Sequence, residues 1–162
     1  MLQTMREPAT RSTRLSITTS QPTEFIDITA LVQSVVREAA LHQGLVNIQS
    51  LHTTAAVVLN EHEPLLLDDF EGFLERLAPG DGRYRHDDES VRTVNVAPGE
   101  RPNGFAHCRA LLLTPSACLN VIGGQIRLGR WQRIFLVELD GPRHRELSVM
   151  TLGVGGGAEP GR

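Results

Sequence analysis

Apolar residues in the first third of the chain recur with strand spacing and then with helix spacing. Residues 14–19 alternate as a strand. Thr29 can cap a helix whose apolar positions keep helical spacing until Gly44, and we expect that helix to cover a sheet. Its apolar positions are Leu31, Val32, Val35, Val36 and Ala39.

The middle of the chain predicts two strands followed by a second helix. Residues 46–51 and 55–59 are strand-like, and Pro64 is suited to the first position of a helix because proline lacks the N–H that is unpaired there. The apolar side of this second helix contains Leu66, Phe70, Phe73, Leu74 and Leu77.

The last third is rich in strands. Segments 117–122 and 125–128 flank Gly123-Gly124, a two-residue hairpin signal, and further strands are expected over 131–139 and 145–152. The pattern predicts the α+β class: a single domain with a large, mostly antiparallel sheet or sandwich layer and two main helices.

Three segments lack this periodicity. Residues 78–105 are polar and punctuated by Gly and Pro, which is long for an irregular connection, and such loops are usually functional or disordered. The two ends carry too little apolar periodicity to pack. We therefore expect a flexible N-terminus over residues 1–12, a single domain over 13–152 and a flexible tail over 153–162.

Composition narrows the function classes. All 16 basic residues of the 162 are Arg, so a catalytic lysine, a lysine Schiff base and a P-loop lysine are excluded. The net charge of -3 argues against nucleic acid as a partner, and no apolar run approaches the roughly 20 residues of a membrane span. The first residues lack the order of a signal peptide, so a cytoplasmic location is expected.

Three histidines stand where a site could form: His52 after an apolar strand, His86 in the long loop and His107 after Phe105-Ala106. Their separations of 34 and 21 residues match no short metal motif. Imidazole is nevertheless the commonest metal ligand and a proton carrier near neutral pH. Spacing alone leaves a metal site and ordinary capped or solvated histidines both open.

Acidic and basic residues offer further candidates, each with an ordinary alternative. Glu61 and Asp69 belong to an acidic cluster around the start of the second helix, where carboxylates either complement the helix dipole or join the histidines. Arg85, Arg130 and Arg143 fall in turns or loops, where guanidinium groups could grip phosphate oxygens. Any one of them alone is ordinary surface charge.

Six short motifs, taken together and in order, resemble the secondary thiamine-phosphate synthase family, also called YjbQ-like. The similarity runs from about Thr13 to Leu152. The motifs are His52-Thr53-Thr54-Ala55, Asn60-Glu61, Tyr84-Arg85-His86, Asn103-Gly104-Phe105-Ala106-His107, Gly129-Arg130-Trp131-Gln132 and Asp140-Gly141-Pro142-Arg143.

The resemblance implies an α+β fold with a large sheet layer, a homotrimer and an active site that draws on His52, His86 and His107. From their placement we expect these histidines to converge on one divalent metal ion (zinc, magnesium or manganese) or on one anion, with Glu61 or Asp69 as candidates for a further metal ligand. The expected substrate-binding residues are Arg85, Asn103, Arg130 and Arg143.

Two departures from the family pattern affect these expectations. Relatives often continue Asn-Glu with Asn-Ala-Asp-Pro, where this chain has His62-Glu63-Pro64-Leu65, so the acidic partner of the site is open. Relatives often have Gly-Thr-Trp-Gln, and Arg130 replaces the threonine here, which bears on anion binding.

The implied activity joins a pyrimidine methyl diphosphate to a thiazole phosphate with loss of pyrophosphate, so the expected partner is a small phosphorylated molecule. Such a reaction requires positioning and charge neutralisation more than a protein nucleophile. Two alternatives remain: a metal-dependent phosphate-ester hydrolase using the same residues, and a non-catalytic trimeric module that binds a small anionic metabolite.

Overall fold

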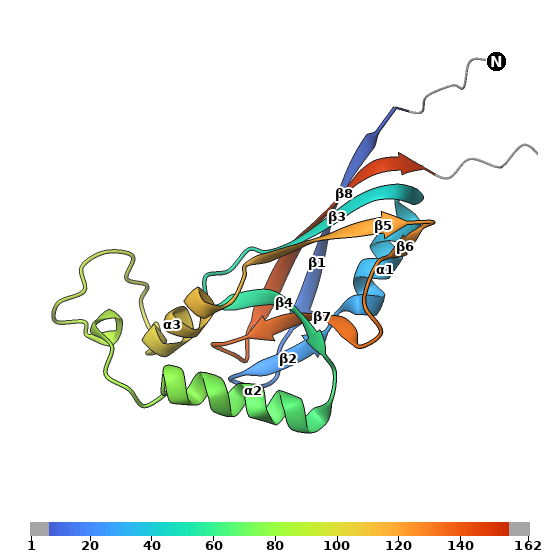
Figure 1. Cartoon of the computed structure of the whole chain (residues 1–162). Helices are drawn as coiled ribbons and strands as arrows, with labels where there is room; N and C mark the ends of the chain where they lie inside the picture. The colour runs from blue at the N-terminus through green and yellow to red at the C-terminus, as the bar shows by residue number, and fades with distance from the viewer. Residues whose placement is uncertain (1–6, 156–162) are drawn as a thin grey trace, which may run out of the picture.

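The computed structural model describes residues 7–155 and confirms the α+β class (Figure 1). Its strands are β1 (Ala9–Thr18), β2 (Glu24–Asp27), β3 (Leu41–Ser50), β4 (Ala55–Glu61), β5 (Ser116–Ile122), β6 (Gln125–Ile126), β7 (Gln132–Glu138) and β8 (His144–Gly155). Its helices are α1 (Thr29–Glu38), α2 (Pro64–Leu77) and α3 (Gly104–Leu112), with a 3₁₀ turn, η1, at Arg85–Asp87.

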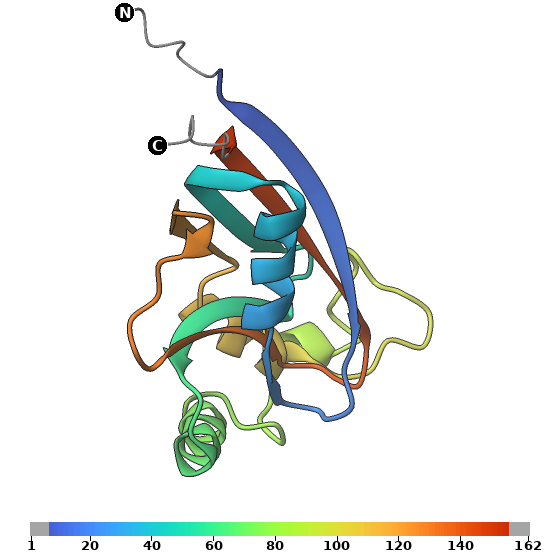
Figure 2. The same ribbon diagram turned by 90° about the vertical axis from the view of Figure 1, so that its right-hand side faces the viewer.

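Two antiparallel sheets form the framework. The larger has the strand order β1-β8-β3-β5-β6 and the smaller has the order β2-β7-β4. Helix α1 lies against the inner face of the larger sheet (Figure 2), where Val32 and Val36 pack with Ile48 and Val149. All four side chains are fully buried, so this layer supplies the main hydrophobic core.

Strand β7 is buried on both faces, which explains its unbroken apolar run. Ile134 and Leu136 belong to the core under α1. Phe135 and Val137 point the other way and pack with Leu74 of α2 and with α3. The smaller sheet therefore lies between α1 on one side and α2 and α3 on the other. Helix α3 directly follows the polar loop, residues 78–103, where the chain returns to the two sheets.

Helix α1 departs from the prediction at both ends. Thr29 does not cap it: the Thr29 hydroxyl accepts a hydrogen bond from the Ile134 N–H at 2.8 Å, and Asp27 accepts from the Thr29 N–H at 2.9 Å. The helix ends at Glu38 rather than near Gly44, because Ala40 adopts a left-handed conformation (φ 49°) and β3 starts at once. The apolar residue Leu41 belongs to this strand.

The chain contains a third helix and a short strand that the pattern did not predict, α3 and β2. Helix α3 has 9 residues, too few for its apolar spacing to stand out beside the polar loop. The predicted hairpin is confirmed, with both Gly123 (φ 63°) and Gly124 (φ 76°) in the left-handed region that favours glycine. Among residues 7–155, no helix is long and apolar enough to cross a membrane.

The first and last strands pair with each other along their length. Ala9 lies opposite Gly153 and Thr18 opposite His144, so β1 begins where β8 ends (Figure 1). Residues 9–12 and 153–155 are therefore in strands rather than in the flexible ends predicted for them. The rest of those two predictions, on residues 1–6 and 156–162, lies outside the described residues.

Candidate functional site

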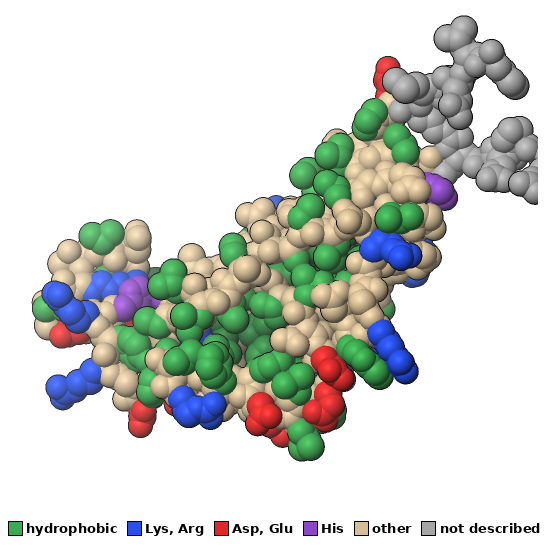
Figure 3. All heavy atoms as spheres, viewed as in Figure 1, with side chains coloured by type: hydrophobic (Ala, Val, Ile, Leu, Met, Phe, Trp, Pro, Cys, Tyr) green, Lys and Arg blue, Asp and Glu red, His purple; other side chains and the backbone are tan. Residues whose placement is uncertain are grey.

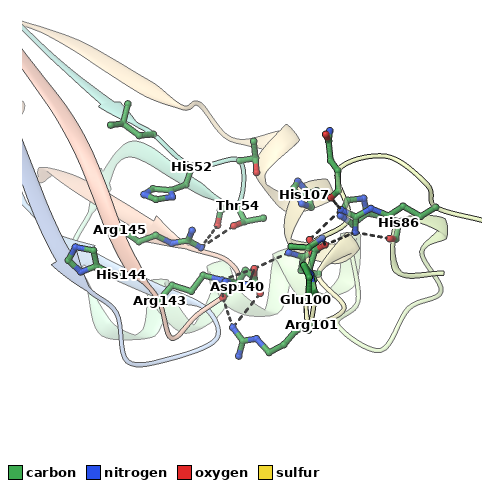
Figure 4. Close-up of a pocket in the computed structure, with 18 residues that line it drawn as sticks. His52, Thr54, His86, Glu100, Arg101, His107, Asp140, Arg143, His144 and Arg145 are labelled. Carbon is green, nitrogen blue, oxygen red and sulfur yellow. Dashed lines mark hydrogen bonds and ion pairs between the residues drawn. The ribbon is translucent and has the colours of Figure 1, made fainter. Parts of the chain in front are cut away.

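An open cleft of about 880 Å³ lies at the end of the larger sheet where β3 stops and β8 begins (Figure 4). Its walls are the turn after β3, the turn between β7 and β8, the polar loop and the start of α3. Polar residues dominate the lining. Its charged and imidazole side chains are His52, His86, His107, His144, Arg92, Arg101, Arg143, Arg145, Glu100 and Asp140.

The imidazoles of His86 and His107 meet at one wall. Their ring centroids are 4.6 Å apart with an interplanar angle of 63°. Nε2 of His86 is buried without a hydrogen-bond partner among the described residues. Burial, followed by the charge of His86, lowers the pKa of His107, so this side chain is a neutral imidazole near pH 7.

The close approach of η1 and α3 brings these two histidines together. One carboxylate oxygen of Asp87 accepts hydrogen bonds from the N–H groups of Asn103 and Gly104, both at 2.9 Å. A Cβ on Gly104 would lie 2.4 Å from Cβ of Tyr84, so only glycine allows this contact. The Asn-Gly-Phe-Ala-His segment thus begins a helix whose first turn presents His107 to His86.

Asp140 connects α3 to the turn between β7 and β8. Its carboxylate accepts from Nδ2 of Asn103 at 3.0 Å and from Nε of Arg143 at 2.9 Å, and it lies 3.7 Å from Nη2 of Arg101. The side chains of Arg143 and Arg101 remain 36% and 53% exposed, so their guanidinium groups are open to a ligand. Asn103 is the N-cap residue of α3, and its carbonyl oxygen accepts from the His107 N–H at 3.3 Å, so Asp140 ties the start of this helix to Arg143.

A buried ion pair between Arg145 and Glu138 supports the turn between β7 and β8. Arg145 donates to both carboxylate oxygens of Glu138 and to the Thr54 hydroxyl. Burial alone would raise the pKa of Glu138, but the bonds from Arg145 and from the Asp140 N–H lower it, so the carboxylate is ionised. The Glu138 side chain is fully buried, and Arg145 at the cleft is 4% exposed.

The polar loop forms a wall of the cleft. Arg92 donates to the carbonyl oxygens of His86 and Asn95 and forms an ion pair with Glu100 at 3.1 Å. These three contacts join the start, middle and end of the segment over residues 86–100. The loop is therefore a folded part of the site.

Comparison with known proteins gives the family of this architecture. The family model described as UPF0047 protein YjbQ-like matches residues 13–154. The chain belongs to this YjbQ-like family. It is 40% identical over 139 residues to a UPF0047 protein of Methanothermobacter thermautotrophicus, covering 86% of this chain and 90% of that one. It is also 38% identical to a UPF0047 protein of Archaeoglobus fulgidus, covering 85% of this chain and 98% of that one.

Solved YjbQ-like structures share the whole fold. A YbjQ-like protein of unknown function from Sulfolobus solfataricus P2 superposes with a TM-score of 0.81 at 30% identity, covering 91% of this chain and 100% of that one. A hypothetical protein from Aeropyrum pernix K1 gives a TM-score of 0.78 at 31% identity, covering 89% of this chain and 99% of that one. The resemblance to the YjbQ-like family read from the motifs is thus confirmed.

The cleft gathers five of the predicted site residues and leaves four outside. His52, His86, His107, Asn103 and Arg143 line it. The four that do not line it are Arg85, Arg130, Glu61 and Asp69.

Each residue outside the cleft has another local setting. The Arg130 guanidinium lies over the Trp131 ring at 4.5 Å, and Glu61 pairs with Gln132 across β4 and β7. Asp69 is exposed on α2, and Glu63 caps that helix by accepting from two N–H groups. Of the acidic cluster around the start of α2, Glu63 caps the helix, and neither Glu61 nor Asp69 lines the cleft with the histidines.

The donor set of one chain does not fit the implied three-histidine metal site. Within residues 7–155, no three His, Cys, Asp or Glu side chains are grouped to hold a metal ion. His86 and His107 adjoin each other, whereas Nε2 of His52 accepts a hydrogen bond from the Glu146 N–H at 2.8 Å. We therefore derive no step through a protein-bound metal.

Sequence reasoning missed several lining residues, and some of them carried a signal. Arg145 occupies an inward-facing position of β8, and Glu138 follows the apolar run of β7. A charged residue at a core-facing position indicates a buried ion pair. Arg92, Glu100 and Arg101 carried no such signal, because polar and charged residues make up most of the segment over residues 86–101 and no periodicity distinguishes these three. His144 directly follows the motif Asp140-Gly141-Pro142-Arg143, but it was not predicted as a site residue.

Proposed function

We propose that the cleft binds a small phosphorylated molecule and that this YjbQ-like chain is a transferase of the thiamine-phosphate synthase type. One observation carries the proposal: the guanidinium groups of Arg101 and Arg143 and the His86–His107 pair open into the same cleft. Guanidinium forks match phosphate oxygens, and imidazoles supply hydrogen bonds and proton transfer.

The charge of the lining supports an anionic ligand. Four arginines and four histidines face two lining carboxylates, Glu100 and Asp140. Arg145 is neutralised by Glu138 and Arg92 by Glu100, which leaves Arg101 and Arg143 sharing the single charge of Asp140. The excess positive charge is thus at the turn between β7 and β8. The volume of about 880 Å³ suits a metabolite rather than a polymer.

The reaction would use the site as follows. The nitrogen lone pair of the thiazole forms a bond to the pyrimidine methylene carbon, and the C–O bond to the diphosphate breaks with its electrons leaving on pyrophosphate. Arg101 and Arg143 would neutralise the charge that grows on the leaving group. His107 would hold the phosphorylated partner by hydrogen bonds from one face of α3, where Asn103 and Asp140 fix its distance from Arg143.

Binding is tested by calorimetry with inorganic pyrophosphate, comparing two arginine variants. Arg143→Ala should weaken binding about ten- to a hundredfold, the effect of one charge-assisted contact of about 1.5–3 kcal/mol. Arg130→Ala removes the same charge outside the cleft and should leave the affinity unchanged. Equal effects of the two substitutions would indicate diffuse attraction to a basic surface and would contradict a specific site.

Turnover is tested by chromatography on the pyrimidine methyl diphosphate and thiazole phosphate pair, with no added metal and with Mg²⁺, Mn²⁺ or Zn²⁺. Wild type should form thiamine phosphate, and His107→Ala should not, while its unfolding midpoint stays close to that of wild type. Equal rates for the two proteins would remove His107 from the site. Phosphate release from one substrate alone would favour the hydrolase, and binding without product would favour the non-catalytic module.

We also propose the homotrimer that the resemblance implies. On the outer face of the larger sheet Leu45 lies opposite Leu152, with Met150 nearby, and each of these side chains is about two-fifths exposed. In Figure 3 the area over β3 and β5 consists mostly of hydrophobic side chains, other uncharged side chains and backbone, with few charged side chains. Light scattering should give three times the chain mass at micromolar concentration, and a monomer mass would contradict the proposal.

A further inference from the structure

His52 is the one imidazole of the cleft with a backbone partner. It lies two residues after the end of β3, and its Nε2 is 2.8 Å from the backbone nitrogen of Glu146 in β8. Its own backbone N–H donates to the Ser50 hydroxyl at 3.3 Å. The main chain and the ring of His52 are thus both held at the cleft end of β3 and β8. Figure 4 shows the ring beside Thr54 and Arg145.

The partner of Nε2 determines the tautomer. A peptide N–H can only donate, so Nε2 of His52 must offer its lone pair, and the proton of the neutral ring must be on Nδ1. Protonating Nε2 would place two hydrogens between two nitrogens 2.8 Å apart and break the bond. Neither nitrogen can exchange roles, because the amide of Glu146 belongs to the backbone of β8, which is paired with β1 on one side and β3 on the other.

The other ring nitrogen is available to a ligand. Nδ1 of His52 has no hydrogen-bond partner in the part of the chain that the structure describes, and it is not among the buried unpartnered atoms. His86 lies at the far wall of the cleft, so the two histidines face different parts of it. The accessible group on His52 is therefore an N–H donor.

We propose that His52 is a fixed neutral hydrogen-bond donor, whose Nδ1–H binds an oxygen of the phosphorylated ligand. The inference rests on the proposed function for the identity of the ligand, and on the Glu146 contact for the tautomer. It departs from the metal-ligand role that the sequence analysis expected. A metal-bound imidazole gives its other N–H to an acceptor, and here the second nitrogen faces a donor.

The surroundings of His52, like its contact with Glu146, favour the neutral form of the ring. Burial and then the positive charge of Arg145 lower the pKa of His52, outweighing the opposite effects of Glu138 and Glu146. His144 is the remaining titratable neighbour and adds to the lowering. The ring therefore stays neutral near pH 7 and can donate without carrying a charge.

The tautomer is tested by long-range ¹⁵N NMR on the free, uniformly labelled full-length chain, with the His52 signals assigned by their loss in His52→Gln. We expect a protonated Nδ1 and an unprotonated Nε2, unchanged between pH 8 and pH 6. A proton on Nε2 at pH 8, or a ring that titrates at the ordinary histidine value of about 6.5, would overturn the fixed tautomer.

The donor role is tested by calorimetry with inorganic pyrophosphate on two matched variants. In His52→Gln, the side-chain oxygen can replace Nε2 as acceptor for Glu146, but no donor remains near Nδ1. In His52→Asn, the amide nitrogen replaces the Nδ1–H donor and the acceptor is lost. We expect about tenfold weaker binding in His52→Gln and a smaller loss in His52→Asn, with both variants folded by circular dichroism.

The outcomes separate this inference from the proposed function. Wild-type affinity in His52→Gln, or a larger loss in His52→Asn, would overturn the donor role. Failure of wild type to bind pyrophosphate would instead overturn the proposed function and the ligand named here, while the NMR result on the free chain decides the tautomer independently.

Discussion

Strand β8 passes through two regions that are built on different principles. Arg145, Leu147 and Val149 all point to the inner side of the larger sheet, and all three are buried. Leu147 and Val149 pack in the apolar core under α1, where many contacts of similar kind surround each side chain. Arg145 lies at the cleft and depends on one carboxylate, that of Glu138.

The difference shows how each region tolerates change. In the apolar core, stability follows the volume and apolar area of a side chain, so neighbours can adjust. At the cleft, the buried polar groups depend on specific partners, and removing one member of a pair leaves the other buried and unpaired. Substitutions of these buried, paired groups should therefore affect both stability and ligand binding, whereas substitutions in the core should affect stability alone.

The largest effect is expected from breaking the buried ion pair. Glu138→Ala leaves Arg145 buried without its counter-charge and should lower the free energy of unfolding by about 3–5 kcal/mol, measured by urea denaturation. Glu38→Ala is the matched control, because its pair with Arg11 is exposed at 4.0 Å and worth about 0–1 kcal/mol. Similar losses in the two variants would contradict the comparison.

A core substitution should be costly and functionally silent. Ile48→Ala removes a fully buried side chain of β3 and should cost about 2–5 kcal/mol, whereas Ile48→Val should cost about 0.5–1.5 kcal/mol. Neither should change the affinity for pyrophosphate, provided that calorimetry is run well below the unfolding midpoint. A binding loss in the folded Ile48→Val protein would show that the two regions are coupled.

The amide of Asn103 should have a smaller effect on stability and a visible effect on binding. Asn103→Ala removes the hydrogen bond to Asp140, worth about 0.5–1.5 kcal/mol, and with it the tie between α3 and the Arg143 turn. Unfolding by urea measures the first effect and pyrophosphate calorimetry the second. Arg85→Ala, a substitution on η1 that leaves the tie intact, should change neither; unchanged binding in Asn103→Ala would show that the tie does not position Arg143.

The smallest effect is a pH dependence. The pKa values of His52 and His107 are lowered in the folded chain, so the unfolded chain binds protons more readily near the ordinary value of 6.5. The stability that these two neutral histidines contribute should be fully present above that pH and should be lost as the pH drops through their lowered pKa values in the folded chain. Thermal midpoints between pH 8 and pH 5 measure this, and a His52→Gln, His107→Gln double variant should show a flatter curve. An equally steep curve would assign the dependence to other groups.

The apolar pattern predicted most strands and two helices, because burying one face of a strand or helix requires apolar residues at the period of that element. The strands around Val46, Ala117 and Leu147 and the helix from Pro64 all appear where periodicity placed them. The predicted end of α1 was wrong, because Leu41 continues the helical spacing of apolar residues although its backbone already belongs to strand β3. Helix α3 was missed because it is short and amphipathic only in part.

The candidate site was predictable only through residues that belong to recognisable motifs. His52, His107 and Arg143 could be chosen from the sequence, but their distances depend on the register of β3 with β8 and on the approach of η1 to α3. Arg85 and Arg130 were equally plausible from composition and lie outside the cleft. Local sequence does not specify which of several turn arginines face one another after folding.

The pairing of β1 with β8 has a practical consequence for engineering this chain. Ala9 and Gly153 are neighbours at one end of the larger sheet, whereas Thr18 and His144 are neighbours at the cleft end. A purification tag or reporter domain fused next to Ala9 or Gly155 would thus be attached at the end of the sheet away from the ligand. The same adjacency suits circular permutation of the described residues: a short linker could join Ala9 to Gly155, and new ends could open at Gly123, where an added side chain would meet nothing within 4 Å.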